Sequence, residues 1–269
     1  ILPDFLGSDQ PRTYALTAMT TPEERSSGGL IGSVGVVTTD NGKISIGDFR
    51  SNGEYIPYGA GDPTEDEQRI FQQWGPLNMS FDVRDLAVYP DTSRSAEGMR
   101  AIWQRTPWGS NTQLDGVLMV DPVFLQELTK ISGNVTIPDG TVLTGDNTAE
   151  FLLNKVYVDY PVSMQDALFA QVAEQTVGSM FSNVDLAKLT KVAQLMGSMA
   201  EGRHFSMYAF DETAEKTISD AGFTAQTPSS EEHPQVGVYV TEQNPSKMGW
   251  YIHRTSKVTR STCGNDGSQ

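Results

Sequence analysis

Hydrophobic and polar residues alternate in several short stretches near the start of the chain, and this pattern predicts β-strands. Thr13–Met19 is one such stretch, and a second runs from Gly29 to the tripeptide Asp40-Asn41-Gly42. A third, Lys43–Phe49, follows directly. Asn-Gly between two β-rich runs is a strong hairpin signal, because a type I′ turn needs positive φ at both central residues. The pattern therefore predicts a hairpin beside a further strand.

Longer stretches carry apolar residues at helical spacing. Thr92–Arg105 is predicted to be a helix with Met99, Ile102 and Trp103 on one face. Two later stretches, 164–181 and 185–200, each carry an apolar stripe and are expected to be amphipathic helices that cover a sheet. Their inner faces are either plain core or the lining of an apolar tunnel. The ten methionines fit both interpretations, since methionine fills irregular spaces.

Helix start and stop signals divide the rest of the chain. The buried strand Leu114–Asp121 leads into a helix with Asp121 as N-cap, Pro122 in its first turn and Gly133 as its end. Asp211 and Gly222 bracket a later helix in the same way. Further strands are predicted at 85–90, 134–140, 204–210, 235–243 and 249–259, and a further helix at 143–157.

Alternating strands and helices predict an α/β fold, with a mixed central β-sheet flanked by helices. At 269 residues the chain is long enough for one large domain, and we expect a single domain over 1–269. Two segments, 51–79 and 225–235, are rich in Gly, Pro, Ser or acidic residues and are expected to be long, mobile surface loops. The first is expected to contain a short helix near Glu65–Trp74.

Charge and cysteine content exclude several classes of protein. The net charge of −15 argues against nonspecific binding to nucleic acid or anionic lipid, because the average field repels polyanions, although local basic surfaces remain possible. A single cysteine, Cys263, excludes an internal disulfide framework and a multi-cysteine metal site. No stretch has the roughly 18 consecutive apolar residues that a spanning helix needs. The abrupt start of the chain, without Met, fits a piece cut from a longer protein.

Familiar catalytic motifs are absent from the sequence, including the nucleophile elbow, the Walker loop and the zinc-binding helix motif. The histidines His204, His233 and His253 occur singly, and each is expected to be structural or solvated. No spacing of paired carboxylates supports a hydrolase. The acidic residues of 61–68 are expected to form a solvated loop.

Arginines at the ends of the predicted elements are the remaining candidates for chemistry. A guanidinium group matches phosphate with two parallel hydrogen bonds, and glycine lets backbone N–H groups approach an anion. The candidate phosphate-binding residues are Arg25, Gly28, Gly29, Arg50, Arg84 and Arg94. The alternative is that these arginines pair with neighbouring acids, namely Glu24, Asp48, Asp82, Asp85 and Asp91.

Four stretches resemble, in order, the bacterial family called domain of unknown function 4012: ERSSGGLIGSVGVVTTDNGKIS, LAVYPDTSRSAEGMRAIW, LDGVLMVDPVFLQELTKISGNVTIPDGTVLTGDNTAEFLLNKVY and VGVYVTEQNPSKMGWYIHR. The resemblance runs from about Thr13 to Arg254 and includes the motifs R-x-x-G-G-x-I-G-S and D-G-V-x-x-x-D-P. It implies an extracytoplasmic protein of the bacterial envelope, anchored in the membrane by an N-terminal helix that this sequence does not include.

The order of elements is also similar to that of the LytR-CpsA-Psr family, which transfers polymers from a polyprenyl-pyrophosphate lipid to the cell wall. This similarity implies a three-layer sandwich in which Arg25 and Arg50 contact the pyrophosphate. The chain departs from that family at two places. Ser26, Ser27 and Gly28 stand where an aspartate is expected, and the segment around Lys155 lacks arginine.

Two functions follow from these resemblances as hypotheses. In the first, the domain transfers a polyprenyl-pyrophosphate-linked glycopolymer to the cell wall, with Arg25, Arg50 and Asp48 as catalytic residues. Mg²⁺ would then be held by a carboxylate such as Asp48 or Asp91. In the second, the domain binds a cell-wall polysaccharide or a protein partner without catalysis. Exposed aromatic residues at 55, 58 and 74 would favour sugar binding, whereas a buried arginine cluster over an apolar cavity would favour the lipid.

Overall fold

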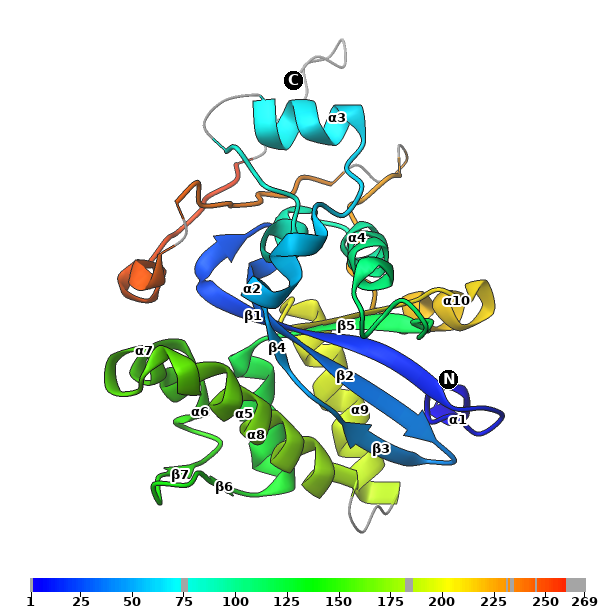
Figure 1. The fold of residues 1–269 in the computed structure, drawn as a ribbon, viewed down its shortest axis with the longest axis vertical. Helices are drawn as coiled ribbons and strands as arrows, with labels where there is room; N and C mark the ends of the chain where they lie inside the picture. Colours follow the sequence, from blue (N-terminus) through cyan, green and yellow to red (C-terminus); the bar gives the residue numbers. More distant parts are fainter. Residues whose placement is uncertain are drawn as a thin grey trace.

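The computed structural model of the chain describes residues 2–73, 77–181, 186–230, 232, 235–244 and 246–259. Among these residues, strands and helices alternate as the sequence predicts (Figure 1). The result is an α/β fold with a mixed sheet.

The six-stranded sheet is centred on two parallel strands. Its order is β3-β2-β1-β5-β8, with the short strand β4 also pairing with β2. Only β1 and β5 are parallel to each other, and all the other pairs are antiparallel. The bounds of the strands are β1 Arg12–Arg25, β2 Gly28–Asp40, β3 Lys43–Ile46, β4 Arg50–Ser51, β5 Gly116–Val120 and β8 Phe205–Ala209.

Strands β1 and β5 are buried on both faces because helices cover both sides of the sheet. Leu16 and Leu118 point to one face and Ala15 and Val117 to the other, so their side chains belong to two separate apolar clusters. Strand β1 pairs with β5 only from Tyr14 to Ala18. The end of β1 therefore extends beyond β5, together with the start of β2.

One face of the sheet is covered by α5, α8 and α9 (Figure 1). Their bounds are α5 Pro122–Ser132, α8 Val162–Phe181 and α9 Leu186–Glu201. The expected amphipathic helices are thus confirmed as α8 and α9. Among the apolar positions of these two helices, the side chains of Met180, Phe181, Leu186 and Leu189 lie outside the described residues.

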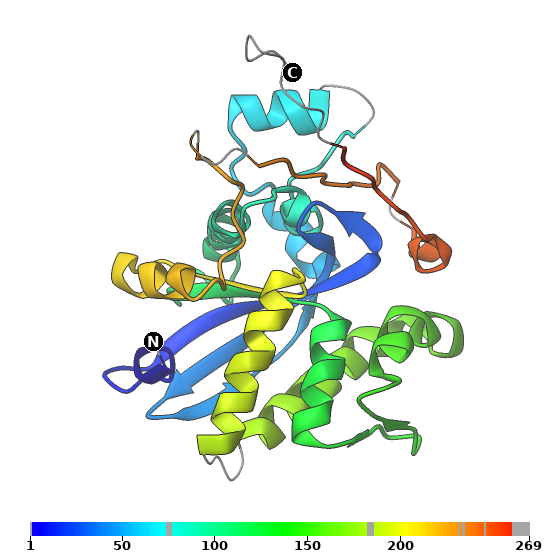
Figure 2. The ribbon, with the colours of Figure 1, turned by 180° about the vertical axis from the view of Figure 1, so that it is seen from behind.

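The opposite face is covered by α2 (Asn52–Tyr55), a 3₁₀-helix η3 (Val83–Val88) and α4 (Thr92–Arg105). Met99, Ile102 and Trp103 of α4 are all buried there, as the periodicity predicts. Figure 2 shows the same two helical layers from behind, and they complete the expected three-layer sandwich.

Smaller elements connect these layers. They are α1 Leu2–Phe5, η1 Ile56–Tyr58, α3 Glu65–Gln68, η2 Arg69–Gln73, β6 Val135–Thr136, β7 Val142–Leu143, α6 Thr148–Glu150, η4 Phe151–Lys155, α7 Val156–Asp159, α10 Glu212–Asp220 and η5 Lys247–Tyr251. Segment 51–73 thus carries several short helices, including the one expected from Glu65. Its predicted end, Trp74, lies outside the described residues, and the mobility of 51–79 and 225–235 stays a prediction.

Local signals fix the hairpin and the helix ends. Asn41 and Gly42 have φ values of 47° and 83°, as the Asn-Gly turn requires. The Asp121 carboxylate accepts a hydrogen bond from Phe124 N at 3.0 Å, and Gly133 ends α5 with a φ of 97°. Asp211 caps α10 in the same manner.

Three predicted strands are wrong. Residues 85–90 lie mainly in η3, where Leu86, Ala87 and Val88 are all completely buried. A continuous apolar run of this length does not distinguish a strand from a buried helical turn, and the Asp82 cap on Arg84 N favours the turn. Residues 235–243 are extended without a sheet partner, and 249–259 begins inside η5. Among the described residues, neither segment lies beside a strand of the sheet with which it forms a ladder of backbone hydrogen bonds.

Candidate functional site

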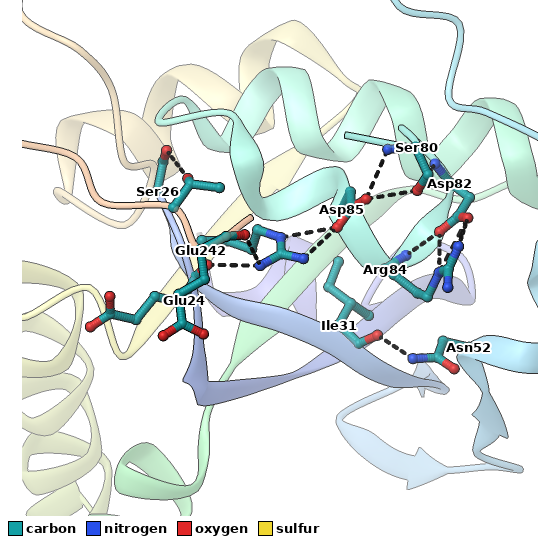
Figure 3. Close-up of polar contacts among 11 residues, drawn as sticks. Glu24, Ser26, Ile31, Asn52, Ser80, Asp82, Arg84, Asp85 and Glu242 are labelled. Carbon is teal, nitrogen blue, oxygen red and sulfur yellow. Dashed lines mark hydrogen bonds and ion pairs between the residues drawn. The ribbon is translucent and has the colours of Figure 1, made fainter. Parts of the chain in front are cut away.

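Arg25 lies in a buried ion pair and not in an open anion site. It is 3% exposed, and its Nε and Nη2 donate to Asp85 Oδ1 at 2.9 and 2.7 Å. Its Nη1 donates to the backbone oxygens of Glu24 and Glu242 at 2.8 and 3.3 Å (Figure 3). All three guanidinium nitrogens are therefore occupied by protein oxygens.

The Asp85 carboxylate completes this network. Its Oδ2 accepts hydrogen bonds from the backbone N and the hydroxyl of Ser80, at 2.9 and 2.7 Å. Burial by itself raises the pKa of Asp85, but the hydrogen bonds from Ser80 and the charge of Arg25 outweigh it and lower the pKa. Asp85 belongs to η3, so the pair lies on the α4 side of the sheet.

The other predicted arginines are also paired. Arg84 contacts Asp82, with Nη2 2.6 Å from Oδ2, and this hydrogen bond raises the pKa of Arg84 (Figure 3). Arg94 contacts Glu67 through Nε and Nη2 at 2.5 and 2.8 Å and lies over the ring of Tyr89. The Arg84–Asp82 contact matches the ion-pair alternative, whereas Glu67, the partner of Arg94, was not among the expected acids.

Arg50 is separate from this network. Its Nη1 donates to Glu54 at 3.0 Å, and its guanidinium lies 4.3 Å from the ring centre of Trp108. The structure brings Arg25 and Arg84 to neighbouring carboxylates on η3 but does not bring Arg50 or Arg94 into contact with them. The four arginines do not converge on one point.

Gly28 and Gly29 have structural reasons to be glycine. A Cβ on Gly29 would lie 2.2 Å from the backbone oxygen of Thr20 on β1. Gly28 has a φ of 135° and begins β2 beside Met19. Both glycines therefore allow β1 and β2 to approach each other closely next to the turn that connects these two strands.

Asp48 and Asp91, the candidate Mg²⁺ ligands, share no contact. Asp48 is exposed, whereas the carboxylate of Asp91 accepts hydrogen bonds from the backbone N and the hydroxyl of Thr227. In the part of the chain that the structure describes, no three His, Cys, Asp or Glu residues are placed to hold a metal ion. These residues do not fit a Mg²⁺ centre, and Mg²⁺ stays a prediction.

The aromatic residues of 51–79 do not form an exposed platform. Tyr55 is 1% exposed and packs edge-on against Trp108, and burial raises the pKa of its phenol to about 12. Tyr58 is half-buried and packs on the same Trp108. Trp74 lies outside the described residues. The observation that would favour sugar binding is therefore missing at Tyr55 and Tyr58.

A large apolar cavity lies on the other face of the sheet, between the strands and helices α5, α8 and α9. Its volume is about 420 Å³, and every described residue that lines it is apolar. The sheet contributes side chains such as Leu16, Val37 and Leu118, and α8 and α9 contribute Ala173 and Met196. Protein cores hold few voids larger than one water molecule, so close packing does not account for this space. Its volume and lining are typical of a ligand pocket.

A smaller pocket of about 30 Å³, the polar pocket, has a mixed polar and apolar lining and lies nearer the start of α8, where the pairing of β1 with β5 ends. Thr20, Ser33, Gln165 and Asp166 contribute its polar groups. Burial raises the pKa of Asp166, and its carboxylate has no hydrogen-bond partner among the described residues. The carboxyl ends of parallel strands are the usual place for ligands in α/β sheets.

Phe49 and Phe169 pack against each other beside the polar pocket. Their ring centres are 5.7 Å apart at an interplanar angle of 63°, and Phe169 lines the polar pocket. Phe49 lies directly over Gly35 of β2, where a Cβ would come within 2.6 Å of its ring. One turn after Phe169, Ala173 lines the apolar cavity. The inner face of α8 therefore passes from a polar pocket to an apolar one.

The pairing of Asp121 with His204 was missed by the sequence analysis. His204 Nδ1 lies 2.6 Å from Asp121 Oδ2, where α5 begins and β8 is about to start. This hydrogen bond raises the pKa of His204, against the effect of burial. Asp121 was identified only as a helix cap, and no local signal connects it to a histidine 83 positions away.

These observations define an α/β protein with an apolar pocket under one helical layer. The chain belongs to a known family: residues 9–157 match the model described as protein of unknown function, DUF4012, which covers more than half of the chain. The resemblance expected from the sequence extends beyond this match, to about Arg254.

Several solved structures are similar to this chain at low identity and low TM-score. One is a protein of Eubacterium siraeum described as a candidate transcription regulator, with 10% identity, 90% of this chain and 88% of that chain covered, and a TM-score of 0.42. Another is TagV of Bacillus subtilis, a LytR-CpsA-Psr family member, with 12% identity, 79% of each chain covered and a TM-score of 0.37. Protein gbs0355 of Streptococcus agalactiae has 10% identity, 79% and 73% coverage and a TM-score of 0.41. A comparison with curated proteins finds no match.

No helix among the described residues combines the length and the apolar character that crossing a membrane requires.

Proposed function

We propose that this chain is an extracytoplasmic domain of the bacterial envelope that holds the apolar chain of a lipid-linked glycopolymer, such as a polyprenyl-pyrophosphate-linked glycan. The apolar cavity of about 420 Å³ between the sheet and α8 and α9 carries the proposal. An all-apolar pocket of this size gains free energy by removing a hydrocarbon chain from water. With the hydrocarbon chain in the cavity, the polar head group of the same lipid lies on the side of the polar pocket at Asp166.

Binding without transfer is the form that the geometry favours. Transfer to the cell wall requires cationic groups at the pyrophosphate, because they neutralise the charge that develops there. Arg25 donates from all three nitrogens to protein oxygens, on the opposite face of the sheet from the cavity. Transfer by Arg25, Arg50 and Asp48 therefore needs a rearrangement that frees Arg25 from Asp85.

The test is displacement of a fluorescent apolar probe from the purified chain by a polyprenol and by a polyprenyl pyrophosphate, with and without Mg²⁺. Ala173→Phe places a ring in the cavity and is expected to abolish probe binding. Ala167→Phe makes the same change on the exposed side of α8 and serves as the matched control.

We expect the polyprenol to compete, which would show that the cavity recognises the chain itself. Competition by the pyrophosphate form alone, in a Mg²⁺-dependent manner, would instead favour the transferase hypothesis. Equal probe binding by the two variants would contradict the proposal. Melting temperatures of both variants show whether either change disturbs the fold.

A further inference from the structure

Exposed apolar side chains gather where α7 meets α8 and on η5. Val158 and Val162 are 73% and 82% exposed, and Met164 is exposed as well. Met248, Tyr251 and Ile252 contribute exposed apolar surface from η5 and the residue after it. We call these six residues the apolar patch. Contiguous exposed apolar surface on a folded protein marks an interaction site more often than isolated apolar residues do.

Two contacts hold the parts of the patch together. Asn154 Nδ2 donates to the Tyr251 hydroxyl at 2.8 Å, and Lys247 Nζ lies 4.2 Å from the ring centre of Tyr157. Figures 1 and 2 both show the orange turn of η5 beside α7, although the two segments are far apart in the sequence. These contacts hold η5 against η4 and α7, just before α8 begins, so the patch combines two parts of the chain.

The charge around η5 differs from that of the whole chain. Residues 246–259 contain no Asp or Glu, in a chain with a net charge of −15, and they include four basic groups: Lys247, His253, Arg254 and Lys257. Lys247 pairs with Glu23, and Arg254 pairs with Glu24 and Glu242. His253 and Lys257 are exposed and have no ion-pair partner among the described residues.

Aromatic residues complete the composition, with Trp250 and Tyr251 between the apolar and basic residues. Trp and Tyr next to apolar and basic side chains are typical of segments that lie at a membrane interface. A folded protein partner does not require this combination, whereas a lipid surface with anionic head groups matches both its apolar and its basic parts.

The patch also includes the first turn of α8, next to the residues of this helix that line the polar pocket. Val162 and Met164 begin this helix, Gln165 and Asp166 of the next turn line the polar pocket, and Ala173 further along lines the apolar cavity. A lipid leaving a membrane at the patch would therefore meet the polar pocket first and the cavity next.

From these observations we infer that the apolar patch docks the protein on a lipid bilayer, with the apolar side chains in the interface and His253 and Lys257 at the head groups. This docking goes beyond the proposed function, because it rests on the exposed patch and not on the cavity. It gives the protein a fixed orientation, with the start of α8 toward the membrane.

The test is cosedimentation of the chain with vesicles of phosphatidylcholine, and of phosphatidylcholine mixed with phosphatidylglycerol. We expect binding to both, and stronger binding to the mixture. Val162→Glu, in the patch, should weaken binding about tenfold, because a charge replaces apolar surface that enters the interface. Val142→Glu changes an exposed valine of β7 and should leave binding unchanged. Tyr251→Glu should act like Val162→Glu.

Absence of binding to either vesicle, or equal loss in Val162→Glu and Val142→Glu, overturns the inference. So does a change of oligomeric state in the patch variants, measured by light scattering, which would make the patch an interface between copies of the chain. Ala173→Phe distinguishes this inference from the proposed function, since it should abolish probe binding in the cavity while vesicle binding persists.

Discussion

Removing the guanidinium of Arg25 separates a structural role from an anion-binding role. Arg25→Met keeps much of the volume of the side chain but leaves Asp85 charged and buried, with only the two hydrogen bonds from Ser80. Breaking a buried ion pair on one side costs about 3–5 kcal/mol. We expect a loss near the lower limit, about 3 kcal/mol, because Ser80 still stabilises the carboxylate. For a chain of this size that loss lowers the melting temperature by about 5 °C.

The assay is urea denaturation followed by circular dichroism, with the double variant Arg25→Met/Asp85→Leu as the control. The double variant should recover most of the lost stability, since it removes the uncompensated charge. The pKa of Asp85 is lowered in the folded protein, so its contribution is present above the pKa of the unfolded state and is lost as the pH falls through the folded value. The effect of Arg25→Met should therefore shrink in acid below about pH 4.

Wild-type stability in Arg25→Met, together with loss of lipid-pyrophosphate binding, would refute this reasoning and return Arg25 to the anion site. A double variant as unstable as the single one would show that the cost arises from packing and not from the buried charge.

Three further predictions concern other parts of the structure. His204→Gln should destabilise the protein most in mild acid, because the hydrogen bond with Asp121 raises the pKa of His204. The stabilisation by protonated His204 is complete below about pH 6.5 and is lost as the pH rises through the folded pKa. Urea midpoints at several pH values measure this dependence. Gly29→Ala should cost about 3 kcal/mol in urea denaturation, since its new methyl carbon meets a backbone oxygen of β1, and an unchanged midpoint would be inconsistent with the close strand contact. Gly35→Ala should displace the Phe49 ring and speed entry of an apolar probe into the cavity, seen as a faster rise of fluorescence in stopped-flow mixing, with a stability loss of about 1–2 kcal/mol.

The parts of the fold that depend on local signals could be predicted from the sequence. The Asn41-Gly42 hairpin, helix α4 and the caps of α5 are each encoded within a few neighbouring residues. Residues 235–243 show the limit of this approach. Their alternation favours a strand, but a strand also needs a neighbouring strand with a free edge. In this segment the backbone N of Glu242 donates to the backbone oxygen of Glu24 on β1, and the pairing does not continue as a ladder among the described residues. Which edges are free is a property of the whole fold.

The candidate site was harder to predict for the same reason. The apolar stripes of α8 and α9 indicated either core or tunnel, and only the distance between helices and sheet leaves a cavity beside Ala173. The arginine positions gave no indication of which arginine is buried. Arg25 meets Asp85 across 60 positions and Glu242 across 217, and neither partner follows from the residues next to it.

The contact between the β1–β2 hairpin and the segment after residue 240 has a consequence for the order of assembly. Glu23, Glu24 and Arg25 obtain partners from Glu242, Lys247 and Arg254, which leave the ribosome more than two hundred residues later. During synthesis the tip of the first hairpin can gain Asp85 as a partner early, but it lacks these later partners until nearly all of the described chain has emerged. Closing so long a loop is slow. A nascent chain that stops before these residues exposes a charged, unfinished hairpin end, which gives a folding chaperone or a protease a means to distinguish incomplete copies.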